Sequence, residues 1–381
     1  MRLRMPTARP QEPQEPHEPH ERQNAPNGQS GRQGGRLSGQ SSPSGQDVGR
    51  DPFFDNAKFL LIVLVALGHS WEQIVYGTHA LQSVHTLIYT FHMPAFILLC
   101  GYFSQRFTGR PDQVRRLVEG VLLPYLFFEL AYSATNSAVR DEPFDFTPTE
   151  PTYLCWFLIA LFLWRLSTPV WRAIRYPVPM AAALSLVAGL TTMHYDLALP
   201  RVLMFLPWFV LGLNLRPEHF ALLRTRMARR CAVPALLCAG AASYLWIPAP
   251  DEHWLSMDTG YTDLDVGWPQ YLAVRIGIFA VSAVLVAAFF ACVPRRRTVF
   301  TALGAVTMYP YLLHGLLIRA GEAAGLYPVL KDLGVLGQVL LTVGVITAVF
   351  LLSTPPVRKV FRRVVEPRLP RRVVPTGERS P

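Results

Sequence analysis

The stretch DNAKFLLIVLVALGHSW, residues 55–71, places a lysine and a histidine on either side of an unbroken apolar run. Ten residues separate Lys58 from His69, and each of them is apolar or glycine. In a helix of about 100° per residue, eleven steps complete about three turns, so the two side chains share one face. At about 1.5 Å per residue they stand roughly 16 Å apart along the axis. The stretch predicts a membrane-spanning helix with an ionisable group near each end.

The composition of the whole chain extends this interpretation. Of its 381 residues, 51% are hydrophobic and 16% are charged. Apolar blocks such as VLLTVGVITAVFLL approach the ~20 residues that cross a bilayer. We therefore expect an all-α, polytopic membrane helical bundle with about ten transmembrane helices. The expected spans are 54–73, 84–104, 117–137, 152–168, 178–195, 201–216, 231–248, 270–293, 299–319 and 335–354.

The net charge of +10 is distributed unevenly over the connecting segments. With the amino terminus placed in the cytoplasm, arginine-rich segments such as RMARR and PRRRT fall on the inner side. The outer segment PAPDEHWLSMDTGYTDLDVG carries no lysine or arginine. This distribution follows the positive-inside rule, so we predict that both termini are cytoplasmic. The charge then has a topological explanation, and we expect no nucleic-acid partner.

The chain is expected to divide into three parts. Residues 1–50 contain QEPQEPHEPHE and almost no large apolar residue, which predicts a disordered cytoplasmic tail. The first apolar run starts only near residue 57, so this segment is not a secretory signal. Residues 51–356 form the transmembrane domain, and residues 357–381 form a basic cytoplasmic tail. The protein is expected to be a multi-pass protein of the plasma membrane, with the lipid bilayer as its surroundings.

Ionisable residues inside predicted spans are the candidates for function, because hydrocarbon rejects charge unless a bundle interior or wet cavity receives it. His92 precedes Pro94 and His314 follows Pro310, and a proline frees backbone groups beside it. Asp55 lies one turn before Lys58, and Glu72 lies one turn after His69. The alternatives are structural: Lys58 as a snorkelling flank, His69 as an interfacial residue, and His92 as a buried histidine bonded to a carbonyl.

Histidine suits proton transfer, because its unperturbed pKa of about 6.5 lets it accept and return a proton near neutral pH. The chain contains no His-x-x-x-His or Glu-x-x-His pair, so we predict no metal site. It also lacks a glycine-rich phosphate loop and a nucleophile-elbow serine.

Taken in order, these motifs resemble the acyltransferase-3 family of integral membrane acyltransferases, most closely its fucose 4-O-acetylase-like subgroup. DNAKFLLIVLVALGH is similar to the subgroup's first span almost position for position. FHMPAFILLCGYFS, LLPYLFFE, PTEPTYLCWFLIALFLWRL, LPRVLMFLPWFVLG and MYPYLLHGLL resemble later segments. The family commonly has arginine where this chain has Lys58, and serine where it has Cys100. The resemblance covers about residues 50–355.

This resemblance implies transfer of an acyl group, typically acetyl from cytoplasmic acetyl-CoA, to a hydroxyl of a sugar, cell-surface glycan or related acceptor. It makes His69 the catalytic histidine and Lys58 its basic partner nearer the donor, with acetyl-CoA as co-substrate and no metal. Candidate substrate-binding residues are Asp55, Glu72, His92, Arg201 and His314.

A second class of function fits the same features. Ten spans, kinked helices and buried histidines also occur in secondary transporters, here an exporter of a glycan or lipid. Transporters often contain two internal repeats, and the Gly-His segment of the first span has no counterpart near residue 230. The acceptor of an acyltransferase is left open: peptidoglycan, a surface polysaccharide, a glycolipid or a secreted natural product.

Overall fold

The computed structural model describes residues 51–75, 78–140, 143–245 and 253–370. In it, residues 55–71 lie within one uninterrupted helix, α1 (Pro52–Trp71). The helix begins where the Asp51 carboxylate accepts a hydrogen bond from the Phe53 amide at 3.0 Å. Pro52 occupies the first helical position, where its missing N–H costs nothing. Helix α1 ends at its C-cap residue, Glu72, so its bounds agree closely with the predicted span 54–73.

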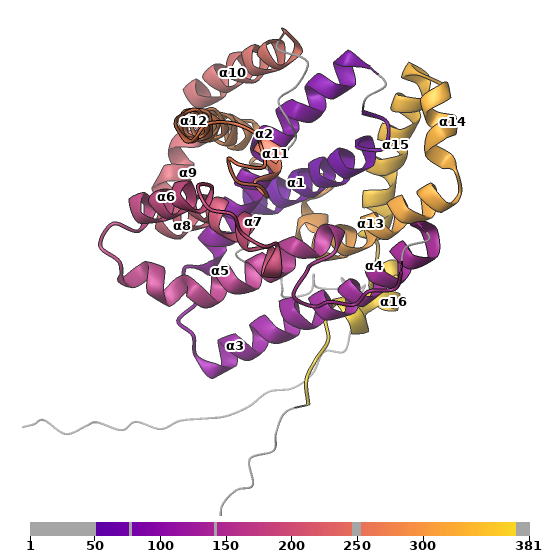
Figure 1. Cartoon of the computed structure of the whole chain (residues 1–381), viewed down its shortest axis with the longest axis horizontal. Coiled ribbons are helices and arrows are strands. Elements are labelled where there is room, and N and C mark those ends of the chain that lie inside the picture. Colours follow the sequence, from indigo (N-terminus) through magenta and orange to yellow (C-terminus); the bar gives the residue numbers. More distant parts are fainter. Residues whose placement is uncertain (1–50, 76–77, 141–142, 246–252, 371–381) are drawn as a thin grey trace, which may run out of the picture. The chain divides into compact units, whose positions relative to one another are not determined.

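Helices make up the regular structure of these ranges, with no strand among them (Figure 1). The remaining α-helices are α2 (His79–Ser104), α3 (Pro111–Leu117), α4 (Leu123–Arg140), α5 (Trp156–Ala173), α6 (Pro177–Ala188), α7 (Leu199–Met204), α8 (Leu206–Asn214), α9 (Pro217–Leu223), α10 (Arg226–Leu245), α11 (His253–Ser256), α12 (Trp268–Cys292), α13 (Met308–Ala323), α14 (Leu326–Asp332), α15 (Val335–Leu352) and α16 (Pro355–Val365). Between them lie a π-helical segment, η2 (Val118–Leu122), which continues α3 into α4, and three 3₁₀-helical turns, η3 (Tyr153–Cys155), η4 (Asp196–Ala198) and η5 (Thr301–Ala305). The prediction of an all-α fold is confirmed.

Six helical segments of the described chain are long and apolar enough to cross a membrane. They are Pro52–Trp71, His79–Ser104, Pro111–Arg140, Tyr153–Ala173, Trp268–Cys292 and Val335–Leu352. A seventh crossing results if Asp196–Met204 and Leu206–Asn214 are counted as one span bent by 58°. The chain is therefore a multi-pass membrane protein, although these counts do not confirm ten spans.

The remaining predicted spans correspond to shorter or more polar helices. In the region 178–195, α6 has only 12 residues and ends at Gly189, before the polar segment TTMHYD. In 231–248, α10 is long enough but its first turn contains RMARR, which lowers its hydropathy. In 299–319, the chain first makes the η5 turn and only then forms α13. Apolar composition predicted where these helices lie but not their lengths.

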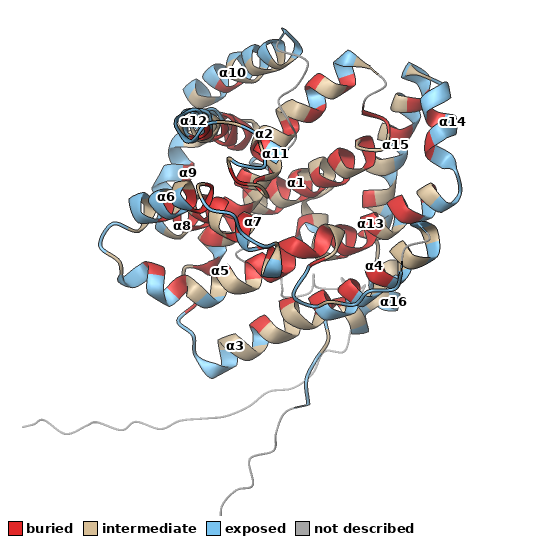
Figure 2. Ribbon diagram, in the orientation of Figure 1, coloured by how far each residue is buried: buried red, intermediate tan, exposed pale blue. Residues whose placement is uncertain are grey.

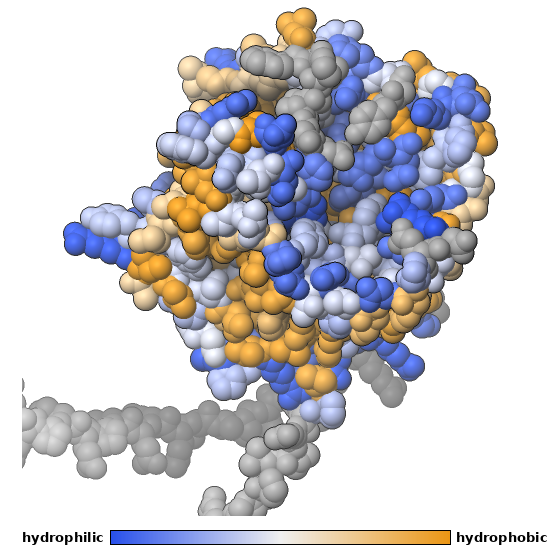
Figure 3. Space-filling model, in the orientation of Figure 1, coloured by the Kyte–Doolittle hydropathy of each residue, from blue (hydrophilic) through white to orange (hydrophobic). Residues whose placement is uncertain are grey.

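The core is built around α1, which packs on α2, α13, α15 and η5. In Figure 2, α1 and α13 are coloured as buried along much of their length, whereas α10 and α14 are largely exposed. Hydrophilic side chains gather in the middle of the face shown in Figure 3, and hydrophobic ones gather toward its lower and left side. An apolar exterior on helices that can span a bilayer is what contact with hydrocarbon requires.

Asn56 fixes the position of α1 along its axis. Its amide nitrogen donates to the carbonyls of Pro294 and Arg296 at 2.9 and 3.0 Å, and its Oδ1 accepts from Thr301 at 2.7 Å. The side chain is fully buried. An amide can donate and accept at once, which explains the use of asparagine between the acidic and basic residues of the DNAK motif.

The proline predicted to disturb α2 has its freed backbone group satisfied by a neighbour. Pro94 has no N–H for the carbonyl of Thr90, four residues earlier. The Ser282 hydroxyl of α12 donates to that carbonyl at 2.6 Å. The helix therefore continues through Pro94 without an unpaired carbonyl, and the hydrogen bond ties α12 to α2.

Helices α2 and α8 approach each other through glycine. A Cβ on Gly101 would meet the Phe209 carbonyl, and a Cβ on Gly212 would meet the Leu98 carbonyl. The backbones therefore touch directly, as small residues allow in membrane helix pairs. This contact sets the distance between α8 and the helix that carries His92.

We expect Gly101→Val to lower the free energy of unfolding by at least about 2 kcal/mol, because the added carbons must displace the α8 backbone. The measurement is thermal or denaturant unfolding of purified protein in detergent. Gly277→Val is the control, since a Cβ on this exposed glycine of α12 meets nothing within 4 Å. Equal stability of the two variants would contradict the close α2–α8 contact.

Candidate functional site

His69 is held at the far end of α1 from Lys58 by a carboxylate from the next turn. Its Nδ1 lies 3.2 Å from Oε1 of Glu72, the residue that ends the helix. The Tyr89 hydroxyl of α2 donates to the same oxygen and lies 3.5 Å from Nδ1. Because a carboxylate only accepts, the contact places the proton on Nδ1 and leaves Nε2 of a neutral ring as a base.

Gly68 makes room for this arrangement. A Cβ at this position would lie 2.8 Å from Cε2 of Tyr89. Any larger residue before His69 would therefore push the tyrosine ring away from Glu72. The Gly-His dipeptide of α1 is thus explained by the close approach of Tyr89, which the sequence did not indicate.

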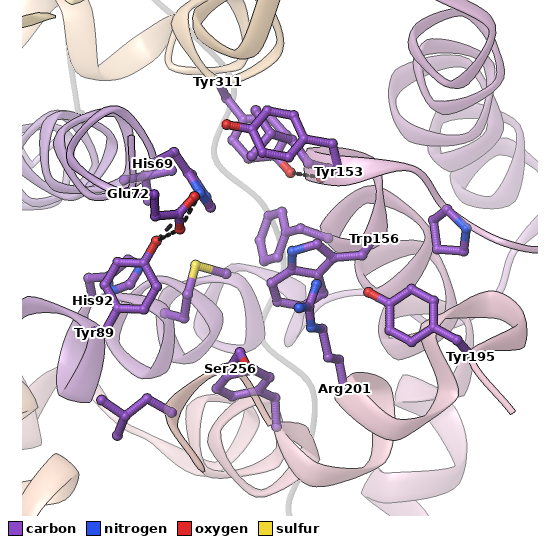
Figure 4. A pocket seen from close by; sticks show the side chains of 17 residues that line it. His69, Glu72, Tyr89, His92, Tyr153, Trp156, Tyr195, Arg201, Ser256 and Tyr311 are labelled. Atoms are coloured by element: carbon purple, nitrogen blue, oxygen red, sulfur yellow. Dashed lines mark hydrogen bonds and ion pairs between the residues drawn. The ribbon is translucent and has the colours of Figure 1, made fainter. Parts of the chain in front are cut away.

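His69 faces a cavity of about 320 Å³ formed at the ends of several helices. Its polar and aromatic lining residues are His69, Glu72, Tyr89, His92, Tyr153, Trp156, Phe157, Tyr195, Arg201, Phe205, Ser256 and Tyr311, most of them labelled in Figure 4. They come from α1 and its C-cap, α2, the turn η3, the start of α5, the segment around α7, the short helix α11 and α13. The cavity can therefore accept a molecule with several polar groups and present it to His69.

Arg201 belongs to α7 and lies on the wall that this helix contributes to the cavity. Its Nη2 lies 2.8 Å from Oδ2 of Asp258, and its guanidinium lies over the Trp156 and Tyr195 rings at 4.9 and 5.5 Å. The Nε atom is buried without a partner among the described residues. Such a guanidinium is fixed in place but retains an unused donor, which suits it to bind an oxygen of a ligand.

Asp258 keeps its charge against its surroundings. Burial alone would raise the pKa of this carboxyl group, but the charge of Arg201 and the hydrogen bond from His253 outweigh burial and hold the pKa below its ordinary value. The His253 Nδ1 lies 2.9 Å from Oδ1 of Asp258. The carboxylate therefore neutralises Arg201 and fastens the segment that carries Ser256 to the cavity wall.

Backbone strain is concentrated at the cavity. Four non-glycine residues near it have positive φ: Tyr153 at 50°, Leu197 and Ala198 at 52°, and Met257 at 53°. Residues with a Cβ rarely adopt such angles, and each costs on the order of 1–3 kcal/mol. Tyr153 is thus itself strained, Leu197 and Ala198 come just before the helix that carries Arg201, and Met257 follows Ser256.

His314 and His92 stand close to His69 in different ways. The His314 ring centroid is 5.9 Å from that of His69, although His314 does not line the cavity. Nδ1 of His314 donates to the Pro310 carbonyl at 2.9 Å, and its Nε2 is buried without a partner among the described residues. His92 lines the cavity, and its Nδ1 donates to the Ile88 carbonyl at 2.8 Å. Both rings are oriented by their own helices.

Lys58 and Asp55 lie apart from this cavity. Lys58 Nζ is 2.7 Å from Oδ1 of Asp55, as their one-turn spacing predicted, and 5.6 Å from the centre of the Phe103 ring. The structure thus brings together His69, Glu72, His92 and Arg201 around one cavity and places His314 behind it. Lys58 and Asp55 form a pair at the opposite end of α1.

A family model described as an acyltransferase domain matches residues 51–355. The chain belongs to this acyltransferase family. It is also similar to Nodulation protein NolL of Mesorhizobium japonicum, at 35% identity over 136 residues. The protein of the same name from Sinorhizobium fredii is 33% identical over 138 residues. These alignments cover 32% of this chain and 36% and 37% of the relatives, little more than a third of their length. No solved structure matches the chain.

Several residues around the cavity were not predicted from sequence. Tyr89, Tyr153, Trp156 and Asp258 were missed. Tyr89 had a usable signal, because it lies three residues before His92 and so on the same side of α2. Asp258 had none, since only the folded chain brings its acidic segment to Arg201, 57 positions away.

We expect Asp258→Asn to lower the free energy of unfolding by about 2–3 kcal/mol at pH 7, because it leaves the Arg201 charge without its partner. A depressed pKa stabilises the folded state above the unfolded value of about 3.9 and loses this effect as pH falls through the folded value. The two proteins should therefore converge only below about pH 4. Unfolding measured from pH 3 to 7 checks this, with the exposed Asp196→Asn as control. A difference that disappears already at pH 6 would contradict the assigned pair.

Proposed function

We propose that this acyltransferase transfers an acetyl group from cytoplasmic acetyl-CoA to a hydroxyl of a sugar, cell-surface glycan or related acceptor at the plasma membrane. The observation that supports it best is the pairing of His69 with Glu72 at the wall of a cavity lined by aromatic rings and Arg201. Sugars present hydroxyls for hydrogen bonding and C–H faces for aromatic rings, and the cavity offers partners for both.

In the proposed reaction, Nε2 of His69 takes the proton from the acceptor hydroxyl. The hydroxyl oxygen then attacks the thioester carbonyl carbon, and the C–S bond breaks to release the thiol of CoA with the proton that His69 returns. Glu72 orients the ring and stabilises the imidazolium form, as a carboxylate does in a Ser-His-Asp triad. Alternatively, Nε2 of His69 attacks the thioester carbon and the C–S bond breaks to release the CoA thiolate. The acceptor hydroxyl then attacks the acetyl-imidazole, the C–N bond breaks, and the hydroxyl proton passes to the thiolate.

Arg201 and His92 are proposed to act on the substrates rather than on the proton. The unused Nε donor of Arg201 is available to an acceptor oxygen or to the oxyanion that forms on the thioester carbonyl. His92 has its Nδ1 engaged with Ile88, so its Nε2 is the nitrogen that can accept from an acceptor hydroxyl. His314 supports the His69 ring from behind.

The proposed topology places ten spans in the membrane with both termini in the cytoplasm. Lys58 then lies on the donor side and His69 roughly 16 Å closer to the outer face. Asp55 holds Lys58 at the donor end of α1. The acceptor approaches from the side of Arg201, whose neighbouring segment 253–266 has an acidic sequence.

Changing His69 to alanine should abolish acetyl transfer, because the chain would lose its base while keeping its cavity. The measurement is transfer from radiolabelled acetyl-CoA to cell-surface glycans in membranes, together with acetyl-CoA hydrolysis by purified protein. His194→Ala, at an exposed histidine after α6, is the matched control and should retain activity. Activity of the His69 variant near that of wild type would refute the assignment.

Changing Glu72 to glutamine should lower kcat by about 10²-fold or more with little change in KM for acetyl-CoA, because the ring loses its anionic partner. Steady-state kinetics of the variant and the wild type, with acetyl-CoA as the varied substrate, measure both constants. A parallel rise in KM without loss of kcat would instead make Glu72 a substrate-binding residue.

A further inference from the structure

The carboxyl-terminal part of the described chain forms a basic helix, α16, that was expected only as a tail. Its apolar residues Val357, Phe361 and Val364 pack on the main core. The cationic residues Arg358, Lys359, Arg362 and Arg363 are exposed at positions i, i+1, i+4 and i+5, which form one stripe of a helix. The helix is therefore attached to the bundle by one side and presents four positive charges on another.

These cationic residues line a cavity of about 960 Å³ between α16 and the first turn of α13. Arg368 adds a fifth positive charge, whereas Glu366 is the one carboxylate among the lining residues. That carboxylate accepts a hydrogen bond from the Tyr309 hydroxyl at 3.1 Å. No ion pair is found for Lys359, Arg362 or Arg363 within the described part of the chain. The cavity thus has an excess of positive charge that the described residues do not neutralise.

Helix α13 connects this cavity to the contact between the His314 and His69 rings. Tyr309 lines the basic cavity, and His314 follows five residues later on the same helix. Five residues rise about 7.5 Å along a helix axis. The His314 ring is in turn 5.9 Å, centroid to centroid, from that of His69. Tyr309, on the wall of the basic cavity, is therefore separated from His69 by little more than one turn of α13 and one ring contact.

Lys58 is less suited to bind several phosphates. Its ammonium group is occupied by Asp55 at 2.7 Å, and its side chain is only 22% exposed. A single paired lysine offers one point charge, whereas arginine guanidinium groups bind phosphate oxygens through two parallel hydrogen bonds. The several phosphates of an acyl-CoA are better matched by a cluster of such groups than by one paired lysine.

We propose that the cavity between α16 and α13 binds the diphosphate and 3′-phosphate of the acyl donor's nucleotide. This inference rests on the proposed function, which names acyl-CoA as donor. Arg358, Lys359, Arg362 and Arg363 hold the phosphates, while the thioester arm extends along α13 toward His69. Anionic lipid headgroups share the phosphate chemistry and are attracted by basic amphipathic helices. The position beside the α13 turn that leads to His69 favours the donor.

The test compares Arg358→Gln/Arg362→Gln with Arg226→Gln/Arg230→Gln, a control that removes the same charge from α10. Each full-length protein is purified in neutral-lipid nanodiscs and assayed with acetyl-CoA and with acetyl-dephospho-CoA, which lacks the 3′-phosphate. We expect the α16 variant to raise KM for acetyl-CoA at least about tenfold with kcat nearly unchanged, and to lose the wild-type preference for acetyl-CoA. Arg358→Lys/Arg362→Lys should give an intermediate KM, because the charge stays and the bidentate contact is lost.

Direct binding separates this inference from the proposed function. Calorimetry with CoA reports the phosphate site even if no acceptor is acetylated, so weaker CoA binding by the α16 variant alone supports the site. Equal CoA affinity and KM in wild type, variant and control would overturn it. An effect of the α16 variant that appears only when phosphatidylglycerol is added to the nanodiscs would also overturn it, in favour of a lipid headgroup site. If the double variant does not fold, the single Arg362→Gln and Lys359→Gln variants are measured in the same way.

Discussion

The buried amide of Asn56 is the contact on which the geometry of the site depends. It binds two carbonyls and two hydroxyls of the 294–301 segment, so α1 cannot slide along its axis without breaking several buried hydrogen bonds. Because α1 is one rigid helix, fixing Asn56 also fixes His69 at the other end. Glu72 and Tyr89 then need only to set the rotation of the imidazole ring. The position of His69 thus originates about three and a half turns away, at Asn56.

A second constraint comes from arginines buried in the bundle. Arg275 is fully buried, donates to the Trp254 carbonyl at 2.7 Å and to the Tyr271 hydroxyl at 3.1 Å, and lies over both aromatic rings. It thereby ties α12 to the segment that carries Ser256 and Asp258. Since Asp258 in turn holds Arg201, two arginines from distant helices position the same cavity wall. Guanidinium groups suit this role because they stay charged and donate in several directions.

Local sequence patterns predicted the parts of the site that lie on one helix. The spacing of Lys58 and His69, the Asp55 pair and the Glu72 neighbour all follow from helical periodicity, and α1 has nearly the predicted bounds. Contacts between segments far apart in sequence could not be read in this way. His69 and His314 are separated by 245 positions, and nothing in either motif indicates that their rings meet. The lengths of α6 and α13 also depended on turns that apolar composition does not reveal.

The separation of about 16 Å between the two ends of α1 has a consequence for transport. It equals about half of the ~30 Å hydrocarbon thickness of a bilayer. In the proposed reaction, the nucleotide stays on one side while the thioester arm carries the acyl group to His69, where an acceptor from the other side receives it. Acylation would then be a vectorial step: a two-carbon fragment crosses the permeability barrier in the act of changing its carrier, and no separate translocator for an activated acyl donor is needed.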